Sequence, residues 1–168
     1  DVADLLTLYG IDDEQERHTF LSLAEQANAP GWWHQYNDIV PDWFELYLGL
    51  EQASSVVRTY EPHLVPGLLQ TEDCARIVIE VGHPDAKPEE IERRVALRMR
   101  RQEVLTRPDP PTLWAVVDEA ALRRLNGRAT MRTQIRHLIA ISELPNVTLQ
   151  AVPFNSGAHP AAGGPFSI

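Results

Sequence analysis

Hydrophobic residues recur along the chain with two different periods, and each period predicts a class of element. Alternating or near-continuous apolar runs near 56–60, 112–117 and 147–153 are typical of short β-strands. The stretches between them carry apolar residues three and four positions apart, which is the spacing of an amphipathic helix. This pattern predicts an α+β fold in which a small sheet is flanked by helices. Residues 112–153 show the strand–helix–strand order of a parallel pair.

Prolines and capping residues set the expected ends of the longer helices. Pro41, at a position where helices favour proline, opens a helix that ends near residue 54. A second long helix is predicted over 88–106, with acids in its first turn and arginines later, as the helix dipole prefers. Residues 1–29 predict an N-terminal segment of two helices. We therefore expect a boundary there, with 30–168 as a second domain.

Shorter elements are predicted in the last third of the chain. Asp118 is the expected N-cap of a helix over 119–125, and Thr130 of another over 130–144. Residues 163–168 resemble the opening of a further strand that stops before it pairs. These elements would complete the helical cover of the sheet.

A conspicuous turn, which we call the elbow, follows the first predicted strand. It comprises Pro66, Gly67, Leu68, Leu69, Gln70 and Thr71. Proline presets φ and glycine tolerates positive φ, so the first two residues signal a turn. Thr71 is followed by two carboxylates, which signals a capped helix start. We interpret the elbow as structural, and the alternative is that it forms the lip of a partner or ligand site.

Charge and cysteine content narrow the classes of function. The 168-residue chain carries a net charge of −9, which argues against binding nucleic acid through its bulk surface. A single cysteine, Cys74, suits a reducing compartment, and we expect a cytoplasmic protein. No apolar run reaches the roughly 18 to 20 residues that a membrane helix requires.

Two polar side chains share the apolar stripe of the predicted 88–106 helix. At about 100° per residue, Arg98 and Gln102 fall on this stripe, whereas Arg101 is expected to point elsewhere. A buried arginine needs a partner, because an unpaired charge is costly to bury. The candidate partners are Glu51, Asp118 and Glu119. Arg98 would then form an internal salt bridge or face a ligand or partner.

Aromatic residues are crowded between residues 32 and 47. Most of them are expected in the core. Tryptophan and tyrosine are also frequent hot spots of interfaces, so Trp32 and Trp33 are candidates for a partner or ligand surface.

Sequence signatures of catalytic, cofactor and metal sites are missing. The chain holds no nucleophile elbow, P-loop, dinucleotide fingerprint or zinc-protease motif, and its six histidines lack metal-ligand spacing. Asp118 and Glu119 follow a predicted interior strand, where α/β proteins place functional carboxylates, although helix capping explains Asp118 equally well. The prediction is a protein without enzymatic activity, metal or cofactor, and an enzyme that uses these two carboxylates is an alternative.

A series of short motifs resembles a known family. The series consists of Gly31-Trp32-Trp33, Leu50-Glu51, Tyr60-Glu61, the elbow with Val65 before it, Arg98 with Arg101-Gln102, Val117 to Arg123, and Pro145 to Pro153. In this order and spacing it is similar to the C-terminal effector domain of actinobacterial Xre-type helix-turn-helix regulators, an antitoxin-like family. The similarity covers the chain from about residue 30 to its end.

The resemblance implies a transcription regulator that is often encoded beside a small partner protein. Residues 1–10 would be the last helix of its DNA-binding domain and 12–27 a connecting helix, so that DNA is contacted only through a domain absent from this sequence. The leading hypothesis is a regulatory domain that binds the cognate partner protein or a second copy as a homodimer, with no role at membranes. The alternative is a small-molecule-sensing domain of the same regulator.

Overall fold

The chain forms two compact units, each described by itself. The computed structural model describes residues 2–28, 31–124, 127–159, 161 and 163–168. The first unit extends to Gln35 and contains α1 (Val2–Leu8) and α2 (Glu14–Asn28). The 3-10 helix η1 (Trp32–Tyr36) spans the division, and the second unit starts at Tyr36. The predicted N-terminal helical segment therefore precedes the sheet.

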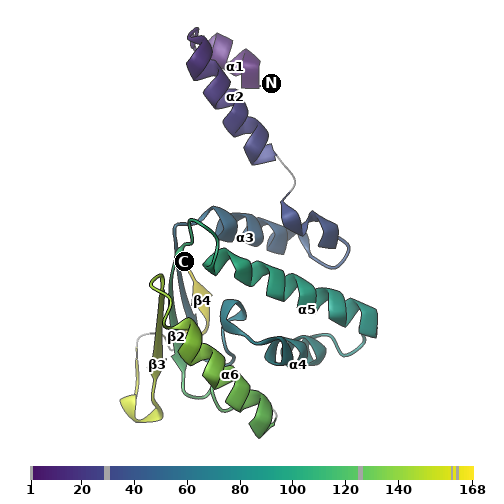
Figure 1. The fold of residues 1–168 in the computed structure, drawn as a ribbon, viewed down its shortest axis with the longest axis vertical. Helices are drawn as coiled ribbons and strands as arrows, with labels where there is room; N and C mark the ends of the chain where they lie inside the picture. Colours follow the sequence, from purple (N-terminus) through teal and green to yellow (C-terminus); the bar gives the residue numbers. More distant parts are fainter. Residues whose placement is uncertain (1, 29–30, 125–126, 160, 162) are drawn as a thin grey trace. The chain divides into compact units, whose positions relative to one another are not determined.

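A four-stranded sheet in the order β3-β2-β1-β4 forms the frame of the second unit (Figure 1). Its strands are β1 (Val56–Glu61), β2 (Thr112–Asp118), β3 (Val147–Val152) and β4 (Phe166–Ser167). β2 lies parallel to both β1 and β3, as the strand–helix–strand order predicts, and β4 pairs with β1 in the antiparallel sense. The α+β prediction is confirmed. The expectation that the last strand stops before pairing is wrong, because the backbones of Arg58 and Ile168 exchange hydrogen bonds.

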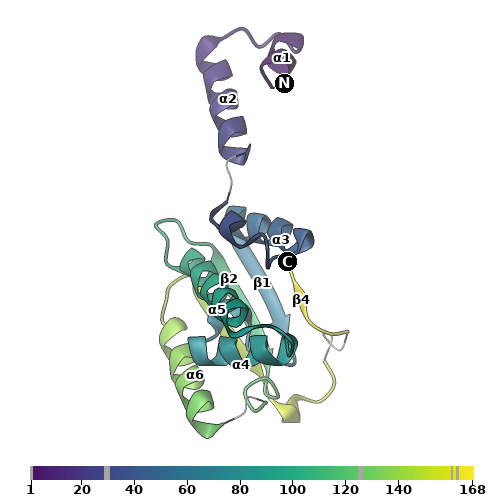
Figure 2. The same ribbon diagram turned by 90° about the vertical axis from the view of Figure 1, so that its right-hand side faces the viewer.

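Helices cover one face of this sheet, as Figures 1 and 2 show from two sides. They are α4 (Glu72–Gly82), α5 (Pro88–Gln102) and α6 (Arg128–Ile141), and the shorter η3 (Glu103–Leu105) continues α5. The covered face carries Val57, Leu113 and Ala115, which are buried together with leucines of the elbow. The open face carries Trp114, which is 44% exposed and donates to Gln150 at 2.8 Å. Alternation along the strands therefore separates a packed face from an open one.

The elbow has the structure that its residues predict. A 3-10 turn, η2 (Gly67–Leu69), leads from β1 into α4. Thr71 is the N-cap of α4, and its hydroxyl oxygen accepts a hydrogen bond from the Cys74 amide at 3.3 Å. Leu69 and Cys74 are fully buried. The elbow thus anchors the strand-to-helix transition in the centre of the core.

Two helix predictions after β2 need correction. Residues 119–123 form successive turns instead of a helix, because the Glu119 amide donates to Val152 of β3 and is held in the sheet. Asp118 accepts from the Ala120 amide at 2.7 Å, which caps this turn. The end of the predicted element, at Leu125, lies outside the described residues. The next helix, α6, begins two residues before Thr130, after Gly127 at a φ of +98°.

Within the part of the chain that the structure describes, no helix combines the length and the apolar character needed to cross a membrane.

Candidate functional site

Two glutamines fasten the elbow to the helices around it. Gln102 of α5 donates to the carbonyl oxygens of Gly67 at 2.9 Å and Gln70 at 2.8 Å. Gln134 of α6 is fully buried, donates to the Leu69 carbonyl at 2.7 Å and accepts from the Thr71 amide at 2.8 Å. These bonds satisfy backbone groups that a turn in the core would otherwise leave unpaired. Gln102, a candidate site residue from the sequence, therefore has a structural role.

Arg98 lies against the elbow without a carboxylate partner in the described ranges. Its Nη1 donates to Oε1 of Gln70 at 2.6 Å, and this is its one hydrogen bond among those residues. The expected salt bridge to Glu51, Asp118 or Glu119 is not formed. Burial lowers the pKa of the Arg98 guanidinium, and the nearby charge of Arg101 lowers it further. A cation thus sits in a partly desolvated place with most of its donors unused.

Arg101 takes the carboxylate that was expected for Arg98. Its Nε and Nη2 donate to the two oxygens of Glu51 at 2.6 Å and 2.5 Å. The side chains are 11% and 4% exposed, so this is a buried bidentate ion pair between α5 and α3 (Asp42–Ala53). The prediction that Arg101 points elsewhere is wrong. Its spacing of three residues from Arg98 places both on neighbouring rows of one helix, and this was the available signal.

An aromatic wall on α3 faces the two arginines. The rings of Phe44 and Tyr47 are stacked with centroids 5.7 Å apart, and Trp43 meets Phe44 edge-on at 5.3 Å. The Arg101 guanidinium lies 5.0 Å from the Tyr47 ring centroid and 5.6 Å from that of Phe44. Cation–π contacts of this kind add to the ion pair in holding Arg101 in place.

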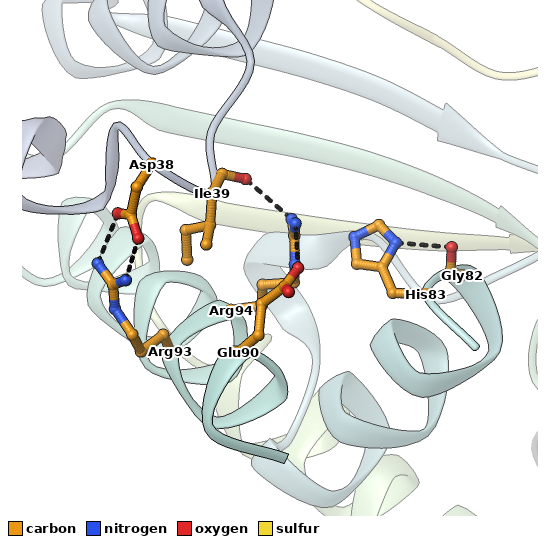
Figure 3. A network of polar contacts seen from close by, with 7 residues as sticks. All are labelled: Asp38, Ile39, Gly82, His83, Glu90, Arg93 and Arg94. Carbon is orange, nitrogen blue, oxygen red and sulfur yellow. Dashed lines mark hydrogen bonds and ion pairs between the residues drawn. The ribbon is translucent and has the colours of Figure 1, made fainter. Parts of the chain in front are cut away.

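A polar network holds the start of α3 against α5 (Figure 3). Asp38 forms a two-point ion pair with Arg93, in which Nη2 lies 2.7 Å from Oδ1. Arg94 donates to the Ile39 carbonyl at 2.9 Å and is itself oriented by Glu90 at 2.7 Å. The segment before α3 is therefore fixed on α5, and the aromatic wall is positioned by it.

The elbow, the aromatic wall and the arginines line a cavity of about 350 Å³ that is open to solvent on one side. Its lining residues are Trp43, Phe44, Tyr47, Val57, Thr59, Glu61, Leu64, Val65, Pro66, Gly67, Leu68, Gln70, Val78, Arg98, Arg101 and Ser167. Its wall combines apolar side chains with several convergent polar groups, as in sites for small ligands. Burial raises the pKa of Glu61.

Gly67 is the point at which the elbow approaches both arginines. A Cβ at this position would lie 3.4 Å from the Nη1 atoms of Arg98 and Arg101, which is ordinary van der Waals contact. The two guanidinium groups therefore converge on one spot. The absence of a side chain at Gly67 leaves that spot open on the cavity side.

The other candidates from the sequence are not among the residues that line this cavity. Trp32 and Trp33 belong to the first unit, where their rings meet edge-on with centroids 5.7 Å apart. Glu119 accepts from Arg123 at 2.8 Å and from the Phe154 amide at 3.0 Å. The Phe154 amide, followed by Arg123, lowers the pKa of Glu119. Asp118 and Glu119 therefore stabilise the turn that follows β2.

Comparison with known proteins identifies one family. Its sequence profile, described as a domain of unknown function (DUF5753), matches residues 44–168. No curated protein and no solved structure matches the chain. The matched stretch contains the elbow, both arginines, Glu51 and most of the aromatic wall, whereas Trp32 and Trp33 lie outside it.

Proposed function

The chain belongs to the DUF5753 family, and from this premise we propose that it is the regulatory, protein-binding domain of a helix-turn-helix transcription regulator of the Xre type. The motif series around the elbow supports the assignment to a regulator. The regulator would contact DNA through a separate domain, since this chain carries a net charge of −9. The role of the domain is to bind a small cognate partner protein or a second copy of itself.

The observation that carries the proposal is an exposed apolar stripe on α3. Trp43, Leu46 and Leu50 follow one another at spacings of three and four residues and are 70%, 67% and 63% exposed. Monomeric domains rarely leave such a stripe in water, and tryptophan is a frequent anchor residue of interfaces. The stripe borders an apolar groove of about 530 Å³, which Val56 and Ile168 also line. Together they form a surface that fits an apolar partner segment.

A calorimetric titration of the full-length regulator with the small protein encoded beside it tests this function. We expect binding by the wild type and loss of at least tenfold in affinity for Leu46→Glu, because a charge would be buried in the interface. Val81→Glu is the matched control, since Val81 is 74% exposed on α4. Light scattering of the same samples reports the homodimer.

Two results would contradict the proposal. One is a wild-type regulator that neither binds the small protein nor dimerises. The other is equal weakening by Leu46→Glu and Val81→Glu, which would indicate a general effect of added charge instead of a specific surface on α3.

A further inference from the structure

We propose that the cavity at the elbow binds a small amphipathic carboxylic acid. Its carboxylate would be held by Arg98 and Arg101, and its apolar body would lie against the aromatic wall of α3. The polar groups of this site come from α5 and the elbow, and Trp43 is the residue that it shares with the proposed partner stripe on α3.

The charges around the cavity favour a ligand with one negative charge. Arg101 is neutralised by Glu51, whereas Arg98 has a neutral partner, Gln70. Arg98 therefore has no ion-pair partner among the described residues. Glu61 lines the same cavity and Glu51 is bonded to Arg101, so a ligand with two negative charges would meet more repulsion than a ligand with one. A carboxylate, with one negative charge, therefore fits these surroundings better than a phosphate dianion.

The unused donors match the shape of a carboxylate. Arg101 gives its Nε and Nη2 to Glu51, and Arg98 gives its Nη1 to Gln70. Three donors make no hydrogen bond within the described part of the chain: Nη1 of Arg101, and Nε and Nη2 of Arg98. A Cβ on Gly67 would lie 3.4 Å from Nη1 of Arg101 and from Nη1 of Arg98, the atom that donates to Gln70, so the two guanidinium groups are neighbours at the cavity. Planar guanidinium groups bind carboxylates with two parallel hydrogen bonds, which single ammonium groups cannot do.

The remainder of the cavity is suited to an apolar body. The side chains that provide this lining are Trp43, Phe44, Leu64, Val65, Leu68 and Val78. A volume of about 350 Å³ lies at the lower end of the range of ligand cavities, so the ligand is small. The hydroxyl groups of Thr59 and Ser167 also line the cavity, and they are hydrogen-bonded to each other at 3.0 Å. They therefore need no polar group of the ligand as a partner.

The experiment uses the full-length protein and 3-phenylpropanoate as the probe, with 3-phenylpropanamide as its uncharged counterpart. Binding is followed by protein NMR shifts of the elbow amides and by calorimetry. For a fragment of this size we expect a dissociation constant on the order of 1 mM for the acid and at least tenfold weaker binding of the amide. Inorganic phosphate is titrated in parallel and should bind more weakly than the acid.

Three variants locate the site. Arg98→Met should weaken binding of the acid at least tenfold, whereas Arg100→Met on the same helix should leave it unchanged. The Arg100 side chain is 52% exposed and pairs with Glu103 at 2.6 Å. Gly67→Ala keeps both arginines but places a methyl group where they converge, so it should also weaken binding. This variant carries the test if Arg98→Met does not fold.

Each of the following results would overturn the proposal: no binding of the acid at about 10 mM, equal binding of acid and amide, tighter binding of phosphate, or unchanged binding by both Arg98→Met and Gly67→Ala. The opposite pattern supports it, whether or not the regulator binds its partner protein.

Discussion

Single residues of the second unit divide into those with complete polar partners and those without. Glu51 and Arg101 form the buried pair, in which each charge depends on the other because neither reaches water freely. Arg98 is three residues away on the same helix, yet its partner is uncharged. The two arginines therefore have opposite consequences: one stabilises the packing of α3 on α5, and the other is available to a ligand.

Removing the charge of Glu51 should destabilise the fold. We expect Glu51→Gln to lower the free energy of unfolding by about 3 kcal/mol or more, because the Arg101 charge is left buried and uncompensated. Urea unfolding measures the change. Glu103→Gln is the control: Glu103 pairs with Arg100 at the surface, both more than half exposed, and its loss should cost less than about 1 kcal/mol. Equal effects would mean that the buried pair contributes no more than an exposed one.

Cys74 should react slowly in the folded protein. Burial raises the pKa of its thiol to about 11, from 9.0, so the reactive thiolate is about a hundredfold scarcer below pH 9. The shift is upward, and reactivity should therefore rise with pH up to about 11. Alkylation with iodoacetamide at several pH values, in buffer and in denaturant, measures this. Rapid alkylation at neutral pH would show that the thiol is accessible.

Elements in the second unit are joined by side chains that complete backbone hydrogen bonding. Gln134 links α6 to the elbow, and Gln102 links α5 to it. Each bond crosses more than thirty residues of sequence, as the separations of 35 and 65 show. The elbow is therefore a junction of β1, α4, α5 and α6, and its geometry depends on all four.

Replacing Gln134 should loosen this junction. Gln134→Leu leaves the Leu69 carbonyl and the Thr71 amide without their partner, and we expect a loss of about 2–3 kcal/mol in stability. Hydrogen exchange at Thr71 should accelerate more than exchange in β2. Arg132→Leu, at an exposed position of the same helix, should change stability by less than about 0.5 kcal/mol. Unchanged exchange at Thr71 in the Gln134 variant would contradict this role.

At the largest scale, the second unit is a sheet whose two faces differ, because helices cover only one of them (Figure 2). Apolar side chains remain exposed along α3 and on the open face of the sheet, among them Trp43 at 70% and Trp114 at 44%. The second unit, residues 36–168, holds 17 Asp and Glu against 14 Lys and Arg, a net charge of −3. A negatively charged domain with an apolar surface suits a protein partner better than a nucleic acid.

The proposed function predicts that DNA is bound by a separate domain and not by this chain. We expect the 168-residue chain to show no measurable binding to duplex DNA at physiological salt, whereas the full-length regulator binds its operator. Fluorescence anisotropy with a labelled operator measures both. Salt-dependent binding by the 168-residue chain would contradict the proposed division of roles.

The sequence by itself determined the elements whose signals are local. The apolar runs located β1, β2 and β3, because a strand half buried in a sheet needs that alternation. The elbow and its Thr71 cap followed from turn and capping chemistry within six residues, and 88–106 from helical spacing. Where a distant backbone competed, as for residues 119–123 held by Val152, the local signal failed.

Only the tertiary structure decided which charges meet. Helical spacing favoured Arg98 as the partner of Glu51, whereas the structure pairs Glu51 with Arg101, three residues further along the same helix. The pair is set by how α3 lies on α5, which Asp38 and Arg94 fix through contacts 55 residues apart. That packing gives Glu51 to Arg101 and leaves Arg98 facing the cavity, because one carboxylate can be saturated by one bidentate guanidinium.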